Sequence, residues 1–193
     1  MRILLPFLFA FVVSTAAAAD PWSESYRLEA SGKYLDAAAQ IEPFVKAGEF
    51  AQLRHAWLLY LGGRFDESVA GYQRAQQMNP NSLDAPLGLT LPLMAQWKWK
   101  EAADVTRKVL RSAPWHYVAS VRLLVILEAQ KQWKPMAEEA ARLAERYPSD
   151  ATAWVYLARG EAASGKAEKA KDAYRRVLQI VPGHIEATSY INR

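Results

Sequence analysis

Residues 151–184 read ATAWVYLARGEAASGKAEKAKDAYRRVLQIVPGH, and this block shows the organisation of the chain most clearly. It holds two segments with helical apolar periodicity, separated by the short turn Ser164-Gly165-Lys166. That pattern predicts two helices joined by a tight turn. The same length recurs along the chain, because four prolines follow one another at a constant interval, at Pro80, Pro114, Pro148 and Pro182. The chain is therefore predicted to repeat one helix pair.

This period of about 34 residues resembles that of the tetratricopeptide repeat (TPR) family. Trp154, Leu157 and Ala158 occupy the W-x2-L-G positions of its motif. The register gives repeats at residues 20–48, 49–82, 83–116, 117–150 and 151–184, followed by a short C-terminal capping helix at 185–193. The resemblance implies an all-α fold, a right-handed superhelix of about five helix-turn-helix repeats with a concave groove.

Two prolines break the helical pattern. Pro92 falls inside the first helix of repeat 83–116, where it removes one backbone hydrogen bond and presses on the carbonyl of Gly88. We therefore expect a kink between Gly88 and Pro92, either simply tolerated or functional. Pro43 interrupts the second helix of the first repeat, so we expect that helix to end early.

The N-terminal segment differs from the repeats. Residues 1–19 carry one charge, Arg2, before an apolar run that ends in Ser14, Thr15 and four alanines. This composition is typical of a secretory signal peptide cleaved after about Ala19, which leaves residues 20–193 as one mature domain. We therefore expect an exported, periplasmic protein of a bacterial envelope. An uncleaved membrane anchor is the alternative.

The composition excludes several kinds of function. Cysteine is absent, so disulfide scaffolds, thiolate metal sites and thiol catalysis are excluded. The net charge of +4 is too mild to favour nucleic acid as a partner. His55, His116 and His184 lie in different repeats, and the chain contains no known catalytic or phosphate-binding motif. We expect a protein that is not an enzyme, with no cofactor, metal or small-molecule substrate.

The resemblance also implies where a partner binds, because the first helix of each TPR pair lines the concave groove. The nine side chains that we predict to bind a partner there are Tyr26, Arg54, Trp57, Tyr60, Leu91, Arg122, Val125, Tyr156 and Arg159. Further groove candidates are Trp22, Phe50, Leu53, Leu61, Leu87, Met94, Val118, Val121, Glu128, Thr152 and Val155. Aromatic and arginine side chains often anchor interfaces, so we expect a protein or peptide with apolar side chains and at least one carboxylate.

Other interpretations of these residues stay open. The groove residues could instead form a homo-oligomer contact in a self-assembling structural protein, or pack against a covering helix of the same chain. The chain could also be an accessory subunit of a secretion, pilus, cytochrome-maturation or polysaccharide-export assembly. Trp97, Trp99 and Trp115 could form a second aromatic patch that binds a sugar or a partner, although packing within and between repeats is the simpler interpretation.

Overall fold

The computed structural model describes residues 20–192, and this part of the chain forms eleven α-helices. The first helices of five consecutive pairs are α1 (Pro21–Ala30), α3 (Glu49–Leu61), α5 (Asp84–Ala95), α7 (Tyr117–Ala129) and α9 (Ala151–Ala163). The second helices are α2 (Tyr34–Ile41), α4 (Phe65–Met78), α6 (Trp99–Ser112), α8 (Trp133–Arg146) and α10 (Ala167–Ile180), and α11 (Ile185–Ile191) ends the array. The predicted all-α superhelix with a C-terminal capping helix is confirmed. The predicted signal peptide, residues 1–19, lies outside the described residues.

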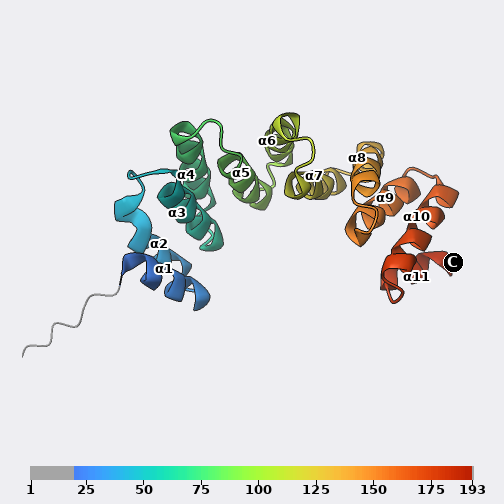
Figure 1. Cartoon of the computed structure of the whole chain (residues 1–193), viewed down its shortest axis with the longest axis horizontal. Helices are drawn as coiled ribbons and strands as arrows, with labels where there is room; N and C mark the ends of the chain where they lie inside the picture. Colours follow the sequence, from blue (N-terminus) through green and yellow to red (C-terminus); the bar gives the residue numbers. More distant parts are fainter. Residues whose placement is uncertain (1–19, 193) are drawn as a thin grey trace, which may run out of the picture.

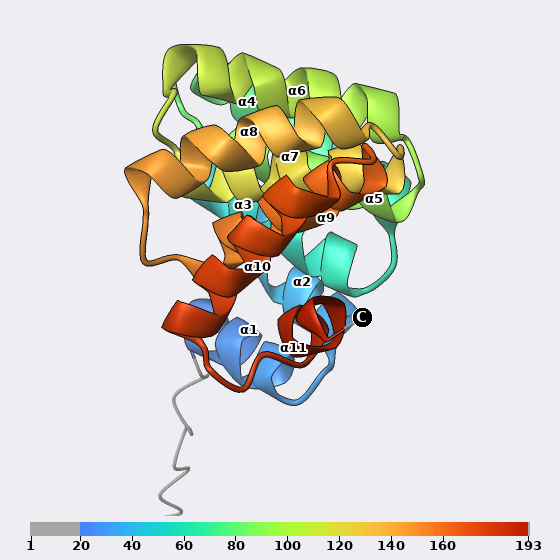
Figure 2. The same cartoon turned by 90° about the vertical axis from the view of Figure 1, so that its right-hand side faces the viewer.

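The helices stack in chain order, so α1 and α11 lie at opposite ends of the array (Figure 1). Seen along the array, the second helices α4, α6 and α8 form an outer layer over the first helices α3 and α7 (Figure 2). Each helix packs mainly on its neighbours along the chain. The core is therefore a continuous seam between successive helices, as expected for a solenoid.

Small residues let the helices of the seam approach one another closely. Ala56, Ser68, Ala102 and Ala170 are fully buried, and the hydroxyl of Ser68 donates to the carbonyl of Ala56 at 2.7 Å. The largest buried cluster runs from α3 to α9 without a break. This continuity means that each repeat depends on its neighbours for burial of its apolar surface.

The turns inside the helix pairs share one backbone conformation. The residue with positive φ is Gly32 (73°), Gly63 (77°), Trp97 (60°), Lys131 (56°) or Gly165 (77°) in successive pairs. Glycine adopts this left-handed conformation without a steric penalty, whereas a Cβ makes it less favourable. The two central turns therefore carry backbone strain that the other three avoid.

The connections between pairs place a helix cap two residues after each of the last three periodic prolines. His116 and His184 each accept a backbone N–H bond through Nδ1 at 3.3 Å, and the carboxylate of Asp150 does the same at 2.9 Å. His55 instead lies half-buried on α3, where burial lowers its pKa. The three histidines therefore lie in separate places, where His116 and His184 cap helices and His55 packs on α3.

The prolines inside helices have different outcomes. The second helix of the first pair ends at Ile41, and Pro43 lies in the short 3-10 helix Glu42–Phe44 that follows it, as predicted. Pro92 is buried inside α5, which runs on to Ala95, and the kink near it stays a prediction. Within residues 20–192, no helix combines the length and the apolar character that a membrane crossing requires.

Candidate functional site

A cavity of about 380 Å³ opens along the first helices, mainly between α3 and α5, and we call it the groove cavity. Its lining residues are Phe50, Leu53, Arg54, Trp57, Tyr72, Asp84, Leu87, Gly88, Leu91 and Arg122. Four of the nine predicted partner-binding residues therefore line one cavity, namely Arg54, Trp57, Leu91 and Arg122. The lining is mostly apolar, with two guanidinium groups and one carboxylate.

One residue in the lining of the groove cavity is a glycine that interrupts the repeat pattern. Arg54, Gly88 and Arg122 occupy the same position in three successive repeats. Gly88 thus removes the side chain that would stand between the two arginine positions. The ring of Tyr72 covers Gly88 so closely that an added Cβ would lie 2.0 Å from its Cε1 atom. The sequence reasoning missed Tyr72, Asp84 and Gly88 as lining residues, although the repeat register already placed Gly88 between the arginines.

Arg122 is held by neutral acceptors. Its Nη1 donates to the hydroxyl of Thr90 at 2.8 Å and to the carbonyl of Leu87, both on α5. Burial lowers the pKa of the guanidinium. Among residues 20–192, no carboxylate forms an ion pair with it, whereas Arg54 and Arg159 both have such partners. Arg122 therefore brings a partly buried positive charge to the groove cavity without an ion pair to Asp84 or to any other carboxylate among the described residues.

The guanidinium of Arg54 already binds side chains of the first repeat. Its Nη1 donates to Glu29 at 2.5 Å, its Nη2 donates to the hydroxyl of Ser25 at 3.1 Å, and its guanidinium lies 3.8 Å from the centre of the Tyr26 ring. The indole of Trp57 donates to the second oxygen of Glu29 at 2.9 Å. Burial raises the pKa of Glu29, but the bonds from Trp57 and Arg54 outweigh it and lower that pKa. This network joins α1 to α3.

The guanidinium of Arg159 binds two carboxylates near the C-terminal end of the array. Its Nε and Nη2 donate to the two oxygens of Glu186 on α11, at 2.8 and 2.6 Å, and its Nη1 donates to Glu128 at 3.1 Å. The hydroxyl of Tyr174 also donates to Glu186, at 2.6 Å. The Arg159 guanidinium lies 5.6 Å from the centre of the Tyr156 ring. This network joins α7, α9, α10 and α11.

The remaining predicted residues lie outside the groove cavity. Tyr60 packs against Trp57 and Phe65, with ring centres 5.6 and 6.1 Å away. Val125 is partly buried on α7. The nine residues therefore fall into three groups along the array, around Arg54, Arg122 and Arg159. Which of them bind a partner stays a prediction.

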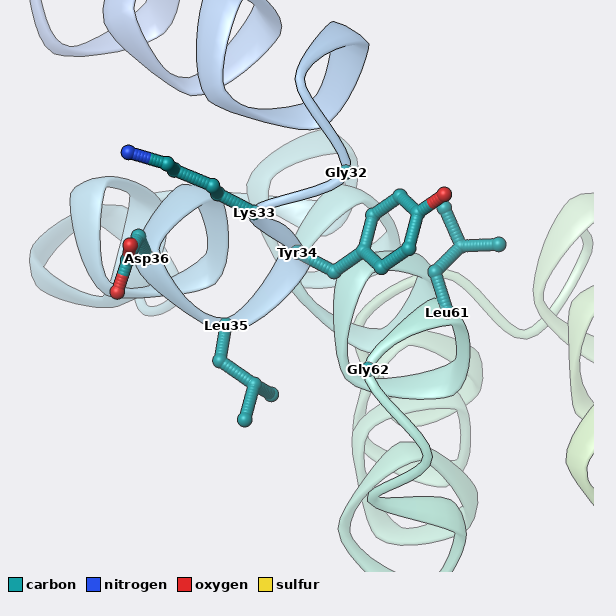
Figure 3. A pocket seen from close by; sticks show the side chains of 7 residues that line it. All are labelled: Gly32, Lys33, Tyr34, Leu35, Asp36, Leu61 and Gly62. Atoms are coloured by element: carbon teal, nitrogen blue, oxygen red, sulfur yellow. The ribbon is translucent and has the colours of Figure 1, made fainter.

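A second cavity, of about 360 Å³, lies where the turn after α1 meets the end of α3 (Figure 3). Residues 32–36, Leu61 and Gly62 line it, and the Tyr34 ring lies beside Leu61 in the close view. A Cβ added to Gly62 would lie 2.4 Å from Leu35 Cδ2, so this junction is closely packed. Leu61, a further groove candidate, thus lines this junction and not the groove cavity.

Comparison with known proteins establishes the family. The tetratricopeptide repeat family model matches residues 24–82 and 137–185, which is more than half of the chain. The chain belongs to the tetratricopeptide repeat family. It is therefore a TPR protein, a scaffold for protein–protein interaction. No curated protein sequence matches it.

Solved structures of other TPR proteins have the same fold. MamA from Desulfovibrio magneticus RS-1 is 15% identical, with a TM-score of 0.74 over 86% of this chain and 95% of that chain. YrrB, described as a TPR protein with an unusual peptide-binding site, is 15% identical, with a TM-score of 0.72 over 90% and 91%. A TPR protein from Parabacteroides merdae is 11% identical, with a TM-score of 0.76 over 89% and 69%. At these identities the likeness shows the fold alone.

The three tryptophans of this TPR protein do not form one aromatic patch, which was the less simple of the two interpretations of these residues. Trp97 and Trp99 do meet, edge to face, with ring centres 5.6 Å apart. Trp115, however, follows the far end of α6, and a helix of 14 residues is about 21 Å long. The three tryptophans are close in sequence, but the whole of α6 separates the turn that holds Trp97 from the turn that holds Trp115.

Acidification is expected to weaken the docking of α11. The bond from Arg159 lowers the pKa of Glu186 below its ordinary value of 4.5, despite an opposing effect of burial. The stabilisation from this pair is therefore present above about pH 4.5 and is lost as the pH falls through the folded-state pKa. Hydrogen exchange of α11 should speed up between pH 6 and pH 3 relative to the other helices. In Glu186→Gln, exchange of α11 should be faster already at pH 6 and should change less on acidification, so equal pH profiles would contradict the assignment.

Proposed function

We propose that this TPR protein is an exported scaffold of the bacterial envelope that binds a carboxylate-bearing segment of a partner protein in the groove cavity. One observation carries the proposal, namely that Arg122 lines an apolar cavity with no carboxylate partner of its own among residues 20–192. A partly buried charge without a counter-charge is costly, and an incoming carboxylate would relieve that cost.

The lining also indicates the rest of the bound segment. Phe50, Leu53 and Leu91 offer apolar surface, and Trp57 is a large aromatic side chain of the kind that anchors interfaces. Asp84 adds one carboxylate to the same lining and favours a basic group elsewhere in the segment. We therefore propose a peptide with one or two apolar side chains, a carboxylate that meets Arg122 and a cation that meets Asp84.

The groove proposal predicts a loss of binding in Arg122→Leu. A charge-assisted hydrogen bond contributes about 1.5–3 kcal/mol, which corresponds to roughly 10- to 100-fold in affinity. A pool of apolar peptides with free C-terminal carboxylates should yield binders by fluorescence anisotropy, and Arg122→Leu should weaken them by that factor. Amidated versions of the same peptides should bind the unchanged protein as weakly as the carboxylate peptides bind the variant.

The matched control is Arg111→Leu, which removes an exposed arginine near the end of α6. This variant should bind the carboxylate peptides like the unchanged protein, and the far-ultraviolet dichroism of both variants should stay the same. If Arg122→Leu kept full affinity and still preferred carboxylates over amides, the groove proposal would be abandoned.

The envelope part of the proposal rests on the composition of residues 1–19 alone. Export with cleavage would give a mature chain that begins at Asp20. Mass spectrometry of the N-terminal peptide, from protein made in a Gram-negative cell and released by osmotic shock, tests this directly. A cytoplasmic chain that still begins at Met1 would remove the envelope from the proposal and leave the groove untouched.

A further inference from the structure

The turn between α5 and α6 presents the most exposed tryptophan of residues 20–192. Trp97 is 77% exposed and stands edge to face on Trp99, whose ring packs against the core. The indole thus contacts Trp99 and leaves most of its own surface in water. A single exposed apolar side chain is ordinary on a protein surface, so Trp97 gains meaning only together with its backbone conformation and the charges near it.

The backbone makes this tryptophan more unusual. Trp97 has a φ of 60°, at the turn position where three of the five repeats have glycine. A residue with a Cβ is less favourable there, so glycine would suit the fold better than tryptophan does. Backbone strain of this kind is found at functional positions.

Four lysines lie on or beside the turn of Trp97 and the equivalent turn of the next repeat. Lys98 and Lys100 follow Trp97, while Lys131 and Lys134 lie at the turn between α7 and α8, and all four are exposed. In the described part of the chain, only Lys166 and Lys171 among the lysines form ion pairs. Glu101 is the single acid in segments 96–101 and 130–135, and Asp66 also reaches this turn, where its carboxylate accepts a bond from Gln96 at 2.7 Å. We call Trp97 and these four lysines the lysine–tryptophan edge.

We propose that the lysine–tryptophan edge docks on an anionic lipid surface, with the Trp97 indole inserted at the headgroup level. Indole rings favour the boundary between water and acyl chains, and clustered lysines are attracted to anionic headgroups. The edge shares no residue with the lining of the groove cavity. Docking through the edge therefore uses none of the side chains that line that cavity.

The chemistry of the edge favours lipid over an acidic protein. All four cations are lysine, a flexible and strongly hydrated point charge that suits a diffuse negative surface. Recognition of a particular carboxylate or phosphate favours arginine, whose planar group binds two oxygens at once. The exposed Trp97 ring can also enter the lipid headgroup layer, which does not need to contain a matching pocket.

The test uses co-sedimentation of residues 20–193, the mature chain that export would give, with large vesicles of phosphatidylcholine, with or without about one third phosphatidylglycerol. Binding should require phosphatidylglycerol and should fall in 0.5 M salt, because salt screens surface charge. Each lysine near an anionic surface contributes about fivefold, so Lys98→Ala with Lys134→Ala should lower the partition coefficient by at least about tenfold. The apolar residues 1–19 are absent from every variant, so these differences report on the edge.

Trp97→Gly separates binding from folding. It should lower the partition coefficient several-fold while the melting temperature stays the same or rises, because glycine relieves the strained turn. Trp115→Ala is the matched control, since Trp115 is 60% exposed but lies beyond the far end of α6. Equal binding to both kinds of vesicle, or equal losses in the two tryptophan variants, would overturn the proposal. So would Trp97-dependent binding of polyglutamate without binding to vesicles, which would make the edge a protein-docking surface.

Discussion

Replacing Tyr72 with alanine is expected to lower the free energy of unfolding by about 3–5 kcal/mol, the range found when a large aromatic core residue is truncated. Tyr72 is 4% exposed and belongs to the largest buried cluster, which joins α3 to α9. Its ring also fills the space above Gly88, so the truncation leaves a void in the middle of the array. Urea denaturation followed by far-ultraviolet dichroism measures the loss.

The control for this prediction is Tyr117→Ala. Tyr117 is 39% exposed and packs edge to face on Tyr147, with ring centres 5.5 Å apart. Its removal should cost about 1 kcal/mol, the scale of one aromatic pair. If the Tyr72 variant cost no more than the Tyr117 variant, the packing described for the centre of the array would be wrong.

Replacing Glu29 with alanine is expected to cost about 3 kcal/mol at the N-terminal end of the array, because breaking a buried ion pair on one side typically costs about 3–5 kcal/mol. The variant leaves the Arg54 guanidinium, whose side chain is 7% exposed, without its carboxylate. The Trp57 indole loses its acceptor at the same time. The 24% exposure of the Glu29 side chain places the expected value at the lower end of that range.

The loss should be local, because a solenoid repeat contacts only its neighbours. Hydrogen exchange should become faster in α1 and α2 and stay nearly the same from α5 onward. Glu29→Gln is the control, since its amide oxygen can still accept from the Trp57 indole and should restore part of the protection. Uniformly faster exchange along the whole array would contradict a local role for the pair.

Much of the fold could be predicted from the sequence because a solenoid encodes it locally. The constant spacing of the prolines, the turn position shared by Gly63 and Gly165 and the small residues at Ala56 and Ala102 all recur from repeat to repeat. Each signal therefore appears several times and supports the others. Helix α2 also ends just before Pro43, as expected because proline lacks the backbone N–H that a helix interior needs.

The site was less predictable, because it depends on which side chains meet across repeats. The register placed Arg54, Arg122 and Arg159 on first helices, but periodicity does not say which acids reach them. Glu29 lies 25 residues before Arg54, and Glu186 lies 27 residues after Arg159. Only the three-dimensional structure shows that Arg54 and Arg159 form ion pairs, whereas Arg122 forms none among the described residues. The close approach of the Tyr72 ring to Gly88 in the lining of the groove cavity likewise depends on packing between α4 and α5, which periodicity does not give.

The two ionic networks differ from the central link in the kind of acceptor that they use. The Glu29–Arg54 pair joins the first two repeats, and Glu128, Arg159 and Glu186 join the last helices, so the links at both ends contain carboxylates. In the middle, Arg122 joins α7 to α5 through a hydroxyl and a carbonyl, which acid does not protonate. Acid therefore acts on the links at the two ends of the array and spares the one beside the groove cavity.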